Sequence, residues 1–278
     1  ARVALGRRLF HDKSLSADGS VACSSCHDLA RYGTDGLATS VGAFGQVGPR
    51  NAPTVVNAGW QFRMFWDGRA ATLEEQAKGP ILNPGEMGMP DGDAVAAALR
   101  ATGQYRESFA RAFPGEKEPI TFDNYAKAIA AFERTLVTRS RWDSFLEGDR
   151  AALSREEKRG LKTFLNAGCM VCHTGRLLGG ATYERAGVVE PWPNQNDLGR
   201  YVVTRDEGDR MVFKVPTLRN VAKTAPYFHD GSAKTLDDAV RMMGRHQLGL
   251  DLSEDETRAI VTWLECLTGE LPPSDLVD

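Results

Sequence analysis

The sequence lacks any long hydrophobic run, and it lacks a strong excess of charge of either sign. No stretch approaches the ~18 consecutive apolar residues that a membrane-spanning helix needs, which excludes a membrane span. The 34 Lys and Arg residues nearly balance the 37 Asp and Glu residues, so the chain shows no basic footprint for nucleic acid. Because 42% of the residues are hydrophobic, disordered and fibrous proteins are also excluded, and a soluble, globular chain is expected.

Cysteine and histidine are scarce, yet four of the 5 cysteines fall in two identical patterns. These are Cys23-x-x-Cys26-His27 and Cys169-x-x-Cys172-His173. Cys-x-x-Cys-His is the attachment signature of c-type haem, in which two thiols form thioethers with the haem and the adjacent histidine binds the iron. A redox-active dithiol or a zinc site is the alternative, but the dithiol does not need the histidine and each cluster offers three zinc ligands rather than four. The sequence therefore predicts two covalently bound c-type haems.

An internal repeat extends beyond the two haem motifs. Pro53-Thr54-x-x-Asn57 is followed by Phe-Trp-Asp-Gly at 65–68, and Pro-Thr-Leu-Arg-Asn at 216–220 is followed by Phe-His-Asp-Gly at 228–231. Trp66 of the first copy corresponds to His229 of the second. The second half carries additional residues, rich in Gly and Pro, that predict a loop near 179–194. We therefore expect two haem domains related by internal duplication, residues 1–137 and 138–278.

The secondary-structure signals favour a mainly α fold with long ordered loops. Ser154-x-x-Glu157 and Ser253-x-x-Glu256 are capping boxes that predict helices over 158–167, running into Cys169, and from 254 to Leu267. Apolar residues at helical spacing predict another helix within 120–137. Short strands are predicted at 201–204 and 211–213. Each domain is expected to pack around its haem, as in a cytochrome c.

The two halves differ in the groups that could face a haem iron. Met242 and Met243 lie in the second half, and a thioether opposite His173 would raise the reduction potential of the iron, although core packing explains methionines equally well. No histidine lies between His27 and His173. Glu86 could move a proton between the oxygen atoms of hydrogen peroxide, but a carboxylate in such a loop is also an ordinary solvated residue.

Many segments, in the same order along essentially the whole chain, resemble the bacterial di-haem cytochrome c peroxidases, a family whose architecture MauG shares. They are residues 23–27, 33–36, 48–54, 65–69, 74–76, 215–220, 224–231 and 247–249. The resemblance implies that the haem on Cys23, Cys26 and His27 is the low-potential, peroxidatic one, with Glu86 and Gln76 in its distal pocket.

The resemblance assigns further roles in the second half and between the two halves. The haem on Cys169, Cys172 and His173 would be the high-potential, electron-transfer one, with Met243 as its sixth ligand. Trp66 would lie on the electron route. Asn51, with the backbone carbonyls of Thr224 and Pro226, would bind a calcium ion, which prefers such oxygen ligands.

One position departs from the family pattern. Members commonly carry a histidine in the loop after the first haem motif, where it caps the peroxidatic iron of the oxidised enzyme, and the corresponding residue here is Ala43. A methyl group cannot bind iron. The peroxidatic site is therefore either open in all redox states, or capped by another group such as Met87, Met89 or water.

The resemblance predicts a periplasmic, homodimeric cytochrome c peroxidase that reduces hydrogen peroxide to water. Electrons from a small soluble c-type cytochrome or blue-copper protein would enter at the C-terminal haem. A non-enzymatic dihaem electron carrier is the alternative, and a MauG-like protein oxidase, which tends to carry Tyr in place of Met243, is a third. No signal peptide is visible, so the chain is expected to be a mature or trimmed form.

Overall fold

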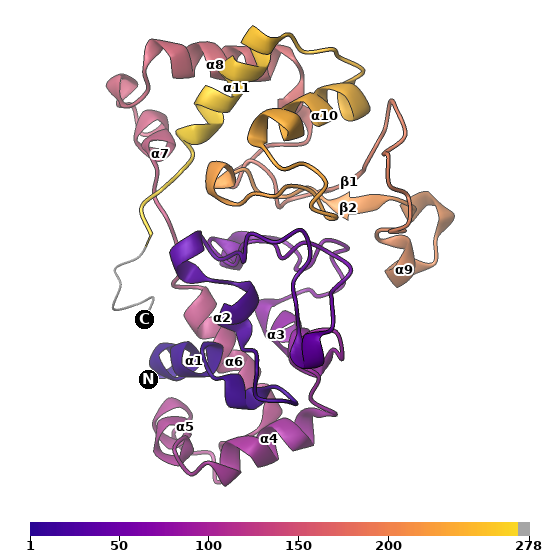
Figure 1. Ribbon diagram of the computed structural model, residues 1–278. Coiled ribbons are helices and arrows are strands. Elements are labelled where there is room, and N and C mark those ends of the chain that lie inside the picture. The colour runs from indigo at the N-terminus through magenta and orange to yellow at the C-terminus, as the bar shows by residue number, and fades with distance from the viewer. Residues whose placement is uncertain (272–278) are drawn as a thin grey trace. The chain divides into compact units, whose positions relative to one another are not determined.

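The computed structural model describes residues 1–271 and is mainly helical, as predicted (Figure 1). The chain divides into two compact units. Unit 1 comprises Ala1–Gly59 and Ala70–Val137, and unit 2 comprises Trp60–Arg69 and Thr138–Glu270. One border between the units falls between 137 and 138, and residues 60–69, which lie in the first half of the sequence, belong to unit 2. No helix within residues 1–271 is long and apolar enough to cross a membrane.

Unit 1 is built from short helices around one apolar core. Its fully buried side chains include Leu9, Phe10, Phe109 and Phe132. Helix α1 (Arg2–Phe10) packs against helix α6 (Phe122–Glu133), and helix α3 (Leu73–Leu82) also packs against α6 (Figure 1). The helices are α1 (Arg2–Phe10), α2 (Cys23–Cys26), α3 (Leu73–Leu82), α4 (Gly92–Ala101), α5 (Arg106–Ala112) and α6 (Phe122–Glu133).

The contact between α1 and α6 depends on a glycine. A Cβ atom at Gly6 would overlap the carbonyl oxygen of Ala128 and would lie 2.8 Å from the Cβ of Phe132. The two backbones therefore approach as closely as they do only because Gly6 has no side chain. This close approach fixes the position of α6.

Unit 2 combines a second helix pair with a small sheet. Helices α8 and α11 pack against each other, and β1 and β2 form an antiparallel pair in which Glu184 lies opposite Phe213. Trp263, which is fully buried, lies in the core between the helices. The elements are α7 (Arg141–Leu146), α8 (Arg155–Asn166), β1 (Tyr183–Arg185), α9 (Tyr201–Thr204), β2 (Val212–Lys214), α10 (Leu236–Leu248) and α11 (Glu254–Glu265).

The helix pair of unit 2 crosses in the same way as that of unit 1. A Cβ atom at Gly160 of α8 would overlap the carbonyl oxygen of Ala259 and would lie 2.8 Å from the Cβ of Trp263. Gly160, Ala259 and Trp263 thus hold the positions that Gly6, Ala128 and Phe132 hold in unit 1. The crossing therefore aligns α6 with α11 at an offset of 131 residues, the separation of Ala128 from Ala259 and of Phe132 from Trp263.

The two Pro-Thr-x-x-Asn segments also share their local structure. The hydroxyls of Thr54 and Thr217 donate to backbone carbonyls at 2.6 and 2.9 Å, and each accepts from the N–H two residues later at 3.0 and 3.1 Å. Both segments end on an asparagine in the left-handed region, with φ of 63° at Asn57 and 62° at Asn220. The same residue pattern therefore produces the same turn in each unit.

The predicted helices are confirmed with adjusted ends. The capping boxes at Ser154 and Ser253 open α8 and α11, but α11 ends at Glu265. Helix α8 ends at Asn166 and does not run into Cys169, because Gly168 has a φ of 88° that breaks the helix. Helix α6, within 120–137, begins only after its N-cap Thr121. Strand β1 lies in the region predicted as a loop.

The prediction of a strand at 201–204 is wrong. These residues form α9, a single helical turn, and Arg205 ends it with a φ of 61°. The N–H of Arg200 donates to Val212 O at 2.8 Å, and Met211 N–H donates to Leu198 O at 3.0 Å, so the residues just before α9 take the available edge of β2. Because residues 201–204 have no free strand edge to pair with, their backbone groups bond to one another in a helical turn, despite the β-branched side chains of the segment.

We expect Gly6→Ala and Gly160→Ala each to lower the free energy of unfolding by about 1–3 kcal/mol, because the added methyl group forces two close-packed helices apart. Denaturant unfolding of the haem-loaded protein measures the change. Gly48→Ala is the control, since a Cβ there meets nothing nearer than Ser40 O at 3.6 Å. Equal stability of all three variants would contradict the close-crossing argument.

Candidate functional site

The first Cys-x-x-Cys-His segment forms a single helical turn. At the start of the turn, Ala22 N–H donates to Ser25 Oγ at 2.9 Å. At its end, His27 N–H donates to Cys23 O at 2.9 Å. Residues three apart in a helix lie on the same face. The turn therefore presents the thiols of Cys23 and Cys26 on one side, with His27 directly after them.

His27 is oriented by a backbone hydrogen bond. Its Nδ1 lies 3.2 Å from Gly33 O, and because a carbonyl can only accept, Nδ1 is the donor. Burial lowers the pKa of His27, and the bond to Gly33 opposes this. A neutral ring with Nδ1–H bound to a carbonyl leaves Nε2 as the free nitrogen, which is the arrangement of a metal-binding histidine.

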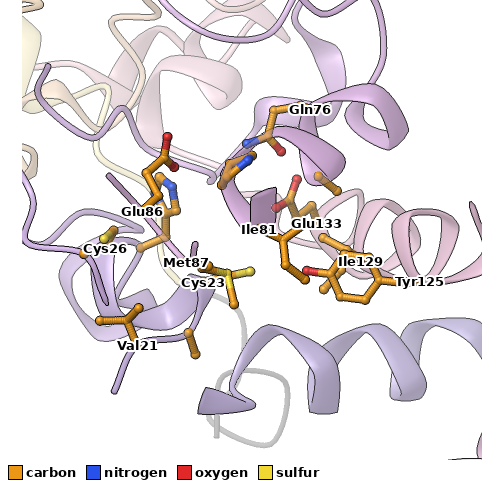
Figure 2. Close-up of a pocket in the computed structure, with 15 residues that line it drawn as sticks. Val21, Cys23, Cys26, Gln76, Ile81, Glu86, Met87, Tyr125, Ile129 and Glu133 are labelled. Atoms are coloured by element: carbon orange, nitrogen blue, oxygen red, sulfur yellow. The ribbon is translucent and has the colours of Figure 1, made fainter. Parts of the chain in front are cut away.

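A pocket of about 510 Å³, a volume that includes space open to solvent, lies against the two thiols and His27 (Figure 2). Its walls come from α2, α3, α6 and the segment after α3. Most of its lining side chains are apolar. The lining residues are Val21, Ala22, Cys23, Cys26, His27, Gly42, Gln76, Ala77, Pro80, Ile81, Glu86, Met87, Tyr125, Ile129 and Glu133.

The pocket contains the two polar residues predicted for it. Gln76 projects from α3, and Glu86 lies in the turn after that helix, on the other side of the pocket in Figure 2. Asn83 Nδ2 donates to Glu86 Oε1 at 2.7 Å, which orients the carboxylate. The structure thus brings Gln76 and Glu86 to the first haem motif, although they follow His27 by 49 and 59 residues in sequence.

The thiols do not favour the zinc or dithiol alternatives. Burial raises the pKa of Cys23 to about 12 and that of Cys169 to about 11, and it raises the pKa values of Cys26 and Cys172 as well. A redox-active dithiol has the opposite shift, because its thiolate must form near neutral pH. Within residues 1–271, no three His, Cys, Asp or Glu side chains are grouped to hold a metal ion.

The residues of the first pocket fit a c-type haem. The space lies beside both thiols, its walls are largely apolar, and the ring of His27 is held with Nε2 free. Such a pocket satisfies the needs of a flat, mostly apolar group that is attached at one edge and bound through its iron.

Ala43 lies in a loop that closes on the segment carrying Glu86. Its N–H donates to Glu86 O at 2.7 Å, and a Cβ at the neighbouring Gly42 would collide with the backbone of Gly85 and Glu86. Gly42 lines the pocket, whereas Ala43 is fully buried and is not among the lining residues. Of the two methionines considered as substitute ligands, Met87 lines the pocket and Met89 does not.

The second haem motif repeats the orientation of the first histidine. His173 Nδ1 lies 3.1 Å from Leu178 O, so Nδ1 is again the donor and Nε2 is left free. Burial lowers the pKa of His173 to about 4. Cys169 opens a 3-10 turn that follows α8 and packs against the apolar cluster around Trp263. The residues of this site also fit a c-type haem.

Met243 and Trp66 pack into one apolar cluster of unit 2. They contact the buried core formed by Trp192, Met211 and Phe213. His229 stacks on Phe213, with ring centroids 4.1 Å apart, and meets Trp66 edge-on at 6.4 Å. The residues that correspond in the two repeats, Trp66 and His229, are therefore neighbours. Met243 and Cys169 belong to different clusters of this unit.

The three residues predicted to bind calcium lie in both units. Asn51 is buried in unit 1 and donates through Nδ2 to Leu37 O at 2.8 Å. Thr224 follows a 3-10 turn in unit 2, where its hydroxyl donates to Val221 O at 3.3 Å, and Pro226 follows a cis peptide bond. Calcium binding at these residues stays a prediction.

Glu133 and Tyr125 are pocket residues that our sequence analysis missed. With Ile129 they lie four residues apart along α6 and therefore line one face of that helix. A carboxyl group at position 133, within the apolar face of a predicted helix, is the sequence feature that indicates a special role for Glu133. Cys266, outside the motifs, is buried in the core of unit 2.

A mainly helical chain with two Cys-x-x-Cys-His sites, in each of which the histidine is held through Nδ1, defines a class of protein, the di-haem c-type cytochromes. Comparisons with known proteins agree. The family model described as di-haem cytochrome c peroxidase matches residues 1–151. A cytochrome c551 peroxidase of Nitrosomonas europaea is 47% identical over 96% of this chain and 80% of its own length.

Two further relatives carry the name of MauG. The methylamine utilization protein MauG of Methylorubrum extorquens is 37% identical over 97% of this chain and 78% of its own length. A crystal structure of a MauG-like protein associated with microbial copper homeostasis superposes with a TM-score of 0.86 at 33% identity, covering 100% of this chain and 91% of that one. The chain belongs to the di-haem cytochrome c peroxidase family, and it is a peroxidase.

We expect the double variant Cys23→Ser/Cys26→Ser to carry one covalent haem in place of two, because only the second motif can then form thioethers. Mass spectrometry and haem staining after denaturation measure the number of haems. Cys266→Ser is the matched control and keeps both haems. Loss of covalent haem from the control, or none from the double variant, would refute the assignment.

Proposed function

We propose that this chain reduces hydrogen peroxide to water at the pocket of unit 1, with electrons from a small soluble c-type cytochrome or blue-copper protein. The electrons enter at the haem held by Cys169, Cys172 and His173. The two haems, when bound, supply the iron centres that carry electrons and react with peroxide. The protein supplies attachment, a pocket of defined polarity and the groups that move protons.

The observation that carries this proposal is the placement of Glu86 and Gln76 in the pocket beside His27. A carboxylate oriented by Asn83 can take a proton from one peroxide oxygen and return it to the other, which makes water the leaving group. The amide of Gln76 can donate to and accept from the same small substrate. A haem that only carries electrons needs neither group.

The arrangement of unit 2 supports a role in electron entry. Met243 is the proposed sixth ligand of the second haem, and a His/Met pair raises the reduction potential. Met243 and the large π-system of Trp66 contact the same buried cluster. We propose that Trp66 carries electrons from this haem towards the pocket of unit 1.

The same reasoning extends the proposal to the whole chain. The matching helix crossings and turns support two haem domains that arose by duplication, 1–137 peroxidatic and 138–278 electron-transferring. Calcium at Asn51, Thr224 and Pro226, a periplasmic location and a homodimer are proposed on the resemblance to the family.

A non-enzymatic electron carrier is the second candidate, and one observation favours it. The thioether of Met87 belongs to the pocket lining and could occupy the sixth position opposite His27. The oxidised spectrum distinguishes the two, since a carrier has two low-spin, six-coordinate haems and does not readily bind azide or cyanide. A MauG-like protein oxidase is disfavoured, because such enzymes tend to carry Tyr at the position of Met243.

We expect Glu86→Gln to lower the rate of peroxide reduction on the order of 10²–10⁴-fold while both haems stay attached, because an amide cannot accept and return the proton. Stopped-flow kinetics with hydrogen peroxide measures the rate. Glu107→Gln, the same change at an exposed position of α5, is the control and keeps the wild-type rate. Unchanged kinetics in Glu86→Gln would retire the assignment.

We expect the fully oxidised protein and the protein pre-reduced by one electron to turn over peroxide equally fast, because Ala43 offers no ligand to close the pocket. In Ala43→His the oxidised form is expected to become slow, since an imidazole can bind iron and the side chain no longer fits the buried position of Ala43. Steady-state turnover with a reduced c-type cytochrome compares the forms. Activity of the unaltered chain only after pre-reduction would show that another group caps the iron.

A further inference from the structure

Glu133 is a buried carboxyl group in the wall of the first pocket. Its exposed fraction is 4%, and most of the side chains that line the pocket with it are apolar. Figure 2 shows it near Gln76, on the side of the pocket away from Glu86. A carboxyl group in such surroundings is costly to ionise, because burial removes most of the water that would stabilise its charge.

The surroundings of Glu133 place the pKa of its carboxyl group near neutral pH, so a modest change in the local electrostatic potential can change its protonation. Burial raises its pKa to about 8, while Arg134 lowers it and Glu74 raises it. Arg134 is itself bound by both oxygens of Glu74, at 2.6 and 2.8 Å, so its charge is largely compensated. The surrounding elements and pocket walls carry other titratable groups as well. They are Arg2, Arg7 and Arg8 on α1, Cys23, Cys26 and His27, Glu75 and Lys78 on α3, Glu86, Asp93 and Arg100 on α4, and Asp123, Tyr125 and Lys127 on α6.

The second unit carries no such carboxyl group. Because Phe132 and Trp263 hold equivalent positions at the two helix crossings, Glu133 corresponds to the next residue of α11, Leu264. Leu264 is buried in the apolar core of its unit. The same helix position is therefore acidic in the unit proposed to have low potential and apolar in the unit proposed to have high potential.

We propose that Glu133 takes up one proton from solvent when the haem of the first pocket gains one electron, and that it thereby makes the reduction potential of this haem depend on pH. The inference rests on the haem attachment at Cys23 and Cys26 in the proposed function. The donor protein supplies one electron, which converts ferric to ferrous iron, and one proton converts the Glu133 carboxylate to the acid. The charge of the pocket is then unchanged by reduction.

The direction of the effect follows from simple electrostatics. An ionised Glu133 stabilises the more positive ferric iron and so lowers the potential, whereas a protonated Glu133 has little effect. The potential therefore falls as pH rises between the pKa values that Glu133 has in the reduced and oxidised states, and it is flat below and above them. Reduction binds the proton because the added negative charge raises the pKa of the carboxyl group.

The test is a spectroelectrochemical titration of the haem-loaded protein from about pH 6 to about pH 9. The wild-type potential of the first haem is expected to fall across this range. Glu133→Gln is expected to give a flat line at the wild-type low-pH value, and to take up about one proton fewer on reduction, measured with a pH-indicator dye. Glu133→Leu, the residue of the second unit, is the second variant in case the amide disturbs folding.

Glu86→Gln makes the same chemical change elsewhere in the pocket lining and is expected to keep the pH dependence. The inference is overturned if Glu133→Gln retains the wild-type slope, or if Glu86→Gln loses it instead. Mass spectrometry of Cys23 and Cys26 separates this result from failure of the proposed function. An attached haem with a pH-independent potential refutes the role of Glu133 alone, whereas a missing haem refutes the attachment on which both depend.

Discussion

The close crossing of α1 and α6 at Gly6 is the contact on which the first site depends. It holds α6 at a distance that no residue with a Cβ allows, and α6 forms one wall of the pocket through Tyr125, Ile129 and Glu133. Helix α3 packs against α6 and contributes Gln76, and the turn after α3 contributes Glu86. A shift of α6 would therefore change the width and the polar lining of the pocket together.

The two units show how one scaffold can support two kinds of haem site. Each crosses its terminal helices at a glycine, each holds a Pro-Thr-x-x-Asn turn, and each orients its histidine through a carbonyl. The differences lie in the side chains that these shared elements present. The pocket of unit 1 has carboxyl and amide groups within a largely apolar lining, whereas unit 2 packs Met243 against aromatic and sulfur-containing residues.

The 60–69 segment connects the two halves in an unexpected way. It belongs to the first half in sequence, yet it packs with unit 2, where Lys214 N–H donates to Trp66 O at 2.7 Å. Trp66 and His229, which hold the same place in the two repeats, meet edge-on in that unit. An aromatic side chain of one repeat is thus part of the core of the other, which suits a residue proposed to lie on the electron route.

Features that follow from local chemistry can be predicted from the amino-acid order alone. The Cys-x-x-Cys-His spacing, the capping boxes of α8 and α11 and the repeat can be recognised because each depends on residues a few positions apart. Gln76 and Glu86 were named for the pocket through the family resemblance, and the structure brings them together there. The tertiary structure is needed to account for the helical turn at 201–204, since the N–H groups of Arg200 and Met211 already donate to Val212 O and Leu198 O. It also decided that Glu133 lines the pocket, because burial of a carboxyl group depends on the packing of distant helices and not on its own sequence neighbours.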